Sequence, residues 1–124
     1  MTSSADKARI ALTVYLDRGK AAIQHFQRGE ADALDTILQK RAAAFHNFAA
    51  IDHKALSEGA DIATDPKVIA LWKEIETVNR ELAELMRGAL DRSNRQLVNG
   101  SSVRHVTKLY HSGEPTPIRF VKVT

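Results

Sequence analysis

Apolar residues recur at helical spacing along most of this chain, and they predict three helices. From about Ser4 to Arg28, the stripe members are three or four residues apart, which places them on one face of a helix. Ser3 or Ser4 is expected to cap the start of this helix. Gly29 suits its end, because glycine adopts the left-handed conformation without a Cβ clash. The stripe consists of Leu12, Leu16, Gly19, Ile23 and Phe26.

A second stripe predicts a helix from about Glu30 to Ile51. With Gly29 as the evident break, the first two helices should form an antiparallel hairpin. Residues 52–65 show no long stripe and predict a connection, with one short helical turn in it. The members of the second stripe are Leu34, Ile37, Leu38, Ala44, Phe45, Phe48 and Ile51.

The strongest periodicity predicts a third helix from Pro66 to Val98, with Asp65 as its cap. Its length of roughly 33 residues corresponds to about 50 Å. The first two helices are each shorter, which leaves room for part of the seam to be uncovered. The seam positions, spaced alternately by three and four, are Val68, Leu71, Ile75, Val78, Leu82, Leu85 and Ala89, and the stripe is broadened by Ile69, Trp72, Met86 and Leu90.

These patterns predict an all-α fold, an antiparallel three-helix bundle with a long third helix and a labile C-terminal segment. Residues 1–100 form the predicted bundle domain, and residues 101–124 form a helical or extended tail. Two prolines break any helix within His111–Pro117, because proline lacks an N–H and disfavours the helical conformation before it. The last residues, Ile118–Thr124, have the composition of a strand.

Composition and charge narrow the classes of function. The 124 residues contain no cysteine, which excludes disulfides and thiolate metal sites, and no apolar run approaches the ~20 residues of a membrane span. A soluble cytoplasmic protein is the expectation. Residues 85–124 carry 7 basic and 2 acidic side chains, whereas residues 1–84 carry 11 and 13. These basic residues are dispersed, so a solvated basic face is favoured over a nucleic-acid footprint.

Residue patterns that carry chemistry give no positive sign of catalysis. None of the five histidines belongs to the Glu-x-x-His arrangement of helical metal sites. The glycines are scattered singly, so no phosphate-binding loop is indicated. We therefore predict no enzymatic activity, no catalytic residues, no metal and no cofactor.

Arg41 interrupts the apolar stripe of the second helix. The favoured interpretation is an arginine whose stem covers core atoms while its guanidinium stays in water. An interhelical pairing of Arg41 is the alternative.

Three stretches of the chain resemble the small α-helical flagellar export chaperones of the FlgN and FliT kinds. Residues 29–45 read Gly-Glu-Ala-Asp-Ala-Leu-Asp-Thr-Ile-Leu-Gln-Lys-Arg-Ala-Ala-Ala-Phe, an acidic helix start followed by spaced leucines and a polar-Arg step. Residues 78–86 read Val-Asn-Arg-Glu-Leu-Ala-Glu-Leu-Met and continue toward Leu97. Leu109 and Tyr110 with Gly113 form the third. The resemblance spans about residues 10–113 and rests on helical pattern and length.

This resemblance implies a non-enzymatic cytoplasmic protein that binds the amphipathic helix of a secreted flagellar subunit in an apolar groove and delivers it for export. Two alternatives stay open: a homo-oligomeric helical module, and a nucleic-acid-associated regulator that uses the basic C-terminal third. The residues expected to bind the partner are Leu82, Leu85, Met86, Ala89, Leu90, Leu97 and Tyr110. Residues 101–110 are expected to fold over that groove when no partner is present.

Overall fold

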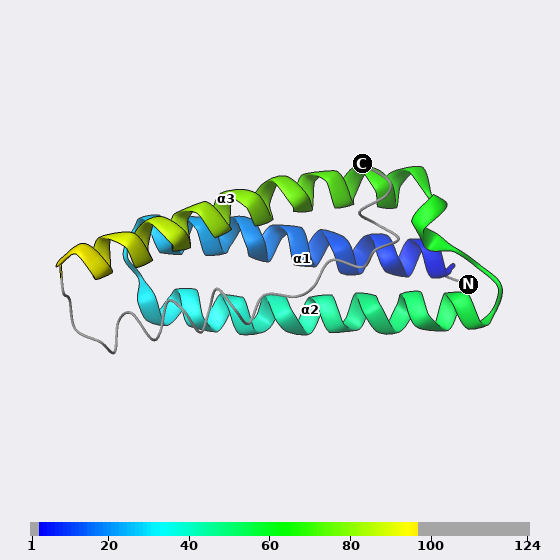
Figure 1. Cartoon of the computed structure of the whole chain (residues 1–124). Coiled ribbons are helices and arrows are strands. Elements are labelled where there is room, and N and C mark those ends of the chain that lie inside the picture. The colour runs from blue at the N-terminus through cyan, green and yellow to red at the C-terminus, as the bar shows by residue number, and fades with distance from the viewer. Residues whose placement is uncertain (1–2, 97–124) are drawn as a thin grey trace.

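The computed structural model describes residues 3–96 of the chain (Figure 1). They form three α-helices and one short 3-10 helix: α1 (Ser4–Gln27), α2 (Ala31–Ser57), η1 (Ile62–Thr64) and α3 (Pro66–Gln96). The prediction of an all-α, antiparallel three-helix bundle with a long third helix is confirmed. The predicted tail, residues 101–124, lies outside the described residues. Within residues 3–96, no helix combines the length and apolar character needed to cross a membrane.

The predicted caps are present at the helix ends. The Ser3 hydroxyl accepts a hydrogen bond from the Asp6 N–H at 3.1 Å, which satisfies a donor in the first turn of α1. The Asp65 carboxylate does the same for α3 and accepts from the N–H groups of Lys67 and Val68, both at 3.0 Å. Gly29 adopts a φ of 70° between α1 and α2, as a glycine helix stop requires.

The end predicted for the second helix at Ile51 is wrong, because α2 continues to Ser57. The additional turns are held by burial: the exposed fraction is 8% for Asp52 and 0% for Ala55, so both face the core beyond Phe48. A buried aspartate breaks the apolar pattern, which hides this part of the helix from sequence reasoning. The short helical turn expected in the connection is η1.

Helix α1 is central to the bundle and packs closely against both α2 and α3 (Figure 1). Helix α2 runs antiparallel to the other two. Alanines such as Ala8, Ala11 and Ala22 are buried along α1, and their small side chains permit close approach. Between α2 and α3 the contacts are made by long side chains instead. The Phe48 and Trp72 rings stack with centroids 5.9 Å apart.

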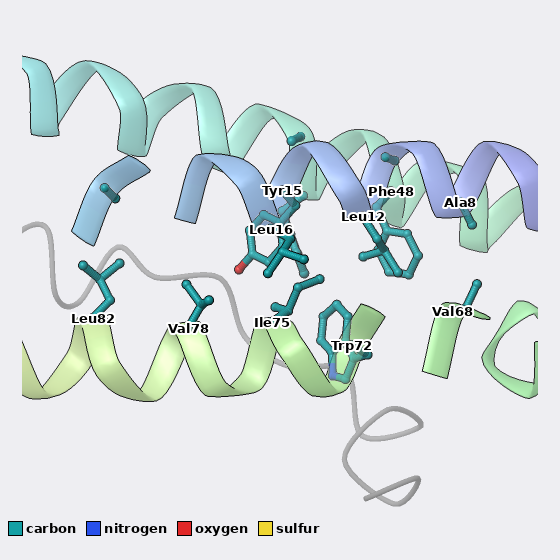
Figure 2. Close-up of a cluster of buried hydrophobic side chains, with 14 of the residues drawn as sticks. Ala8, Leu12, Tyr15, Leu16, Phe48, Val68, Trp72, Ile75, Val78 and Leu82 are labelled. Atoms are coloured by element: carbon teal, nitrogen blue, oxygen red, sulfur yellow. The ribbon is translucent and has the colours of Figure 1, made fainter. Parts of the chain in front are cut away.

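The core lies mainly where α1 meets α3 and the aromatic residues of α2. Figure 2 shows Leu12, Tyr15 and Leu16 of α1 directed toward Ile75 and Trp72 of α3. Tyr15 also contacts the ring of Phe45 in α2, with centroids 5.6 Å apart. These large side chains from all three helices fill one continuous core.

Helix α3 extends beyond the other two helices. It runs parallel to α1, and Val78 lies against Gly19. From this contact α1 ends at Gln27 whereas α3 reaches Gln96, so α3 continues about ten residues farther, or ~15 Å. The projecting end of α3 is visible in Figure 1.

The close approach at Gly19 predicts that Gly19→Ala destabilises the protein. An added Cβ would lie 2.8 Å from Val78 Cγ1 and 3.0 Å from Arg41 Nε, so packed groups must shift. We expect a loss of about 1–3 kcal/mol in the free energy of unfolding, measured by urea titration. Gly88→Ala is the control, because its Cβ would meet only the flexible end of Arg92 at 3.5 Å. That variant should gain about 0.4–1 kcal/mol. Equal stability of Gly19→Ala and the parent chain would contradict the packing described.

The N-terminus of α1 predicts a small acid-dependent contribution to stability. Hydrogen bonding to Ser3, and then the Arg9 guanidinium at 2.5 Å, lower the pKa of Asp6 below its usual value. The ionised form is therefore favoured in the folded state. Its contribution is present at neutral pH and is lost as the pH falls through the folded-state pKa. An NMR titration of the Asp6 carboxyl should give a midpoint below the usual ~3.9; a midpoint at or above it would refute this.

Candidate partner-binding surface

The residues predicted to bind a partner divide into three groups. Leu82 and Met86 belong to the core, with exposed fractions of 6% and 3%. Leu85 is half-buried and packs against that core. Ala89 and Leu90 are half-buried near the point where α3 leaves the cover of α1. Leu97 and Tyr110 lie outside the described residues.

The register of α2 against α3 shows where the cover by α2 ends. Arg41 contacts Asn79 and Phe48 contacts Trp72, so seven residues separate the contacts on both antiparallel helices. If the same one-to-one register is continued along both helices, Ala31 at the start of α2 lies level with about Ala89 of α3. The part of α3 from Leu90 onward therefore extends past both neighbours.

One flank of α2 faces away from α1 and carries a row of positions seven residues apart. The opposite flank borders α1, because Ile37 lies beside His25, and Ile51 beside Ser4, in shallow hollows between the two helices. On the flank away from α1, Leu56 is 42% exposed and the other three members are half-buried. The row consists of Asp35, Ala42, Ala49 and Leu56.

A matching row lies on the flank of α3 that faces away from α1. The α1 side of α3 is marked by Glu74, whose carboxylate is 3.9 Å from the Lys20 ammonium. The row on the other side is half-buried throughout and consists of Ile69, Glu76, Ala83 and Leu90. We call the two rows together the α2–α3 face. A period of seven keeps each row in line along a pair of packed helices.

The α2–α3 face is apolar where a solvated bundle usually carries charge. Positions that flank a helical core are commonly Glu or Lys, yet three of the four members of each row are apolar. The charged members, Asp35 and Glu76, are both carboxylates. The face therefore suits an apolar partner with a positive charge near its edge. The seven-residue recurrence is visible in the sequence, but its alignment across two helices is not.

Beneath this face, the Arg41 guanidinium crosses from α2 to α3. Its exposed fraction is 5%, its Cζ lies 4.0 Å from the centroid of the Tyr15 ring, and its Nη2 donates to Asn79 Oδ1. The favoured prediction, a guanidinium kept in water, is therefore wrong, and the interhelical alternative is correct. Gly19 makes room for the guanidinium on α1. No pattern in the sequence predicted Asn79 as the partner of Arg41.

Two further predictions bear on chemistry and charge. Among residues 3–96, no group of three His, Cys, Asp or Glu side chains is placed to hold a metal ion. Within the basic C-terminal third, Arg104, Lys108, Arg119 and Lys122 lie outside the described residues. Residues 1–96 carry 14 basic and 14 acidic side chains, so the net charge of +3 comes from the part after them.

Comparisons of this chain with models of protein families, with curated proteins and with solved structures find no match.

The different burial of Leu82 and Leu90 predicts different effects of truncation. Leu82→Ala removes buried methyl groups and leaves a cavity, so we expect a loss of about 2–5 kcal/mol in unfolding free energy. Leu90→Ala, at a half-buried position beyond the cover, should cost less than about 1 kcal/mol. Urea unfolding of both variants measures the contrast. Similar losses at the two positions would show that Leu90 is also covered.

Proposed function

We propose that this chain is a non-enzymatic binding protein that sequesters an amphipathic helix of a secreted flagellar subunit and delivers it for export. The observation that carries the proposal is the α2–α3 face, whose two rows carry half-buried apolar side chains along the bundle, with Leu56 42% exposed. Leu56, Ile69 and Leu90 are its large apolar members. The flagellar class of partner and the cytoplasmic location come from the resemblance to export chaperones.

Helix-in-groove recognition explains how such a partner would bind. An amphipathic helix presents apolar side chains every three or four residues, and these can lie between two neighbouring helices. Helices α2 and α3 approach each other through long side chains, so a partner helix laid along them would complete a four-helix arrangement. The half-buried Leu90 would extend the contact along α3. Leu85 and Ala89 follow Glu74 and Val78 by eleven residues, or three helical turns, so they lie on the α1 side of α3 instead. Leu82 and Met86 would support the contact from the core.

The charges on the face restrict the chemistry of the partner. Asp35 lies toward the start of α2 and Glu76 in the first half of α3. A partner helix with Lys or Arg beside its apolar stripe would meet both carboxylates. Such pairs at a rim contribute chiefly to the rate and specificity of association rather than to affinity.

A pair of adjacent positions on α2 provides a matched test. His46 lies between Ala42 and Ala49 in helical spacing and borders the α2–α3 face, whereas Asn47 borders the α1 side, and both are exposed. We place p-benzoylphenylalanine at each position in turn, irradiate cells of the native host and map the captured peptide by mass spectrometry.

The expected result is capture at position 46 of an amphipathic helix from a secreted flagellar subunit, with much lower yield at position 47. Equal yields at both positions would reject the α2–α3 face as the binding surface. Capture at position 46 of only a second copy of this chain would favour the homo-oligomer alternative and reject the chaperone proposal.

A further inference from the structure

Arg41 forms a polar contact between α2 and α3 in the middle of the bundle. Its guanidinium leaves α2, passes over Gly19 of α1 and ends on the Asn79 side chain of α3. Tyr15 contributes a ring face to the same cation at 4.0 Å. The contact therefore engages all three helices at one level.

Burial of a guanidinium adds little to the free energy of unfolding. Its desolvation is costly, and replacement of buried charged groups by apolar side chains of similar size is often neutral or stabilising. The partners seen here, an amide oxygen and an aromatic ring, are each individually modest. Selection of one alignment of the helices is another role that a buried charged group can have.

The apolar contacts between α2 and α3 do not by themselves choose one register. The core positions one turn to either side of Asn79 are Ile75 and Leu82, and those two turns away are Trp72 and Met86. All four are apolar or largely so, and an aromatic or aliphatic side chain on α2 can pack against any of them. None of these four side chains offers an oxygen acceptor, whereas Asn79 does. Glu76, three residues before Asn79 and also half-buried, carries a carboxylate on the α2–α3 face.

We infer that Arg41 is the positioning residue that fixes the register of α2 against α3, with Asn79 as its acceptor and Gly19 as its passage. A single buried polar group is known to select the register of packed helices at some cost in stability. The same register aligns the row at Ala42 and Ala49 with the row at Glu76 and Ala83. The importance of this alignment rests on the proposed function, because a partner would contact both rows at once.

The test uses the full chain and readouts that need no partner. Arg41→Met removes the charge and leaves a shorter, unbranched apolar side chain that can adapt to the core. Its urea midpoint should be unchanged or higher, while amide spectra of α2 and α3 should show more than one set of peaks. The control is Arg18→Met, since Arg18 also makes an interhelical hydrogen bond, to the Lys40 carbonyl at 2.6 Å, but at the edge of the bundle. Arg18→Met should keep a single set of amide peaks.

A distance measurement identifies the second state as a register shift. The chain has no cysteine, so spin labels at Ala43→Cys and Lys67→Cys, two exposed positions, report a single α2–α3 distance. In Arg41→Met we expect the distribution to split, because a slip by one turn moves α3 by ~5.4 Å along its axis. An unchanged single distance with a single set of peaks would overturn the inference.

Asn79→Leu provides the complementary variant. It leaves the buried guanidinium without this acceptor, so its urea midpoint should fall. The double variant Arg41→Met with Asn79→Leu should recover the midpoint of Arg41→Met and still show several registers. Unfolding of both Arg41→Met and the double variant would show that Arg41 acts through stability, and this too would overturn the inference. Photo-capture from position 46 fails independently if the proposed function is wrong.

Discussion

The bundle depends on the absence of a side chain at Gly19. Because α1 has no Cβ at this point, Val78 of α3 and the Arg41 guanidinium of α2 meet on the same small area of its surface. One open position thereby sets how closely α3 approaches α1 and leaves a path for the buried Arg41 side chain. The buried alanines of α1 extend the same close packing along its length.

Much of the fold could be predicted because it follows from local rules. Short-range features include the caps at Ser3 and Asp65 and the helix stop at Gly29. The apolar residues of α3 recur every three or four positions, which predicts a helix directly. The apolar periodicity does not predict the last turns of α2, because Asp52 is polar although it is buried. Burial of a polar group depends on neighbours that are distant in the sequence, which periodicity does not report.

The candidate surface was harder to predict than the fold. The apolar seam of α3 predicts Leu82 and Met86 as partner-binding residues, although the bundle itself buries both. The α2–α3 face combines two rows on helices whose relative register only the structure provides. The pairing of Arg41 with Asn79 has the same origin, since the two residues are 38 positions apart.

The short turn at Gly29 has a consequence for the order of assembly. Three residues join α1 to α2, and eight join α2 to α3. Closing the shorter α1–α2 loop therefore costs less conformational entropy. Contacts that are near in sequence tend to form first. The surface shared by α2 and α3 then exists only after α3 has docked. A partner that binds this surface therefore binds only the completely folded chain.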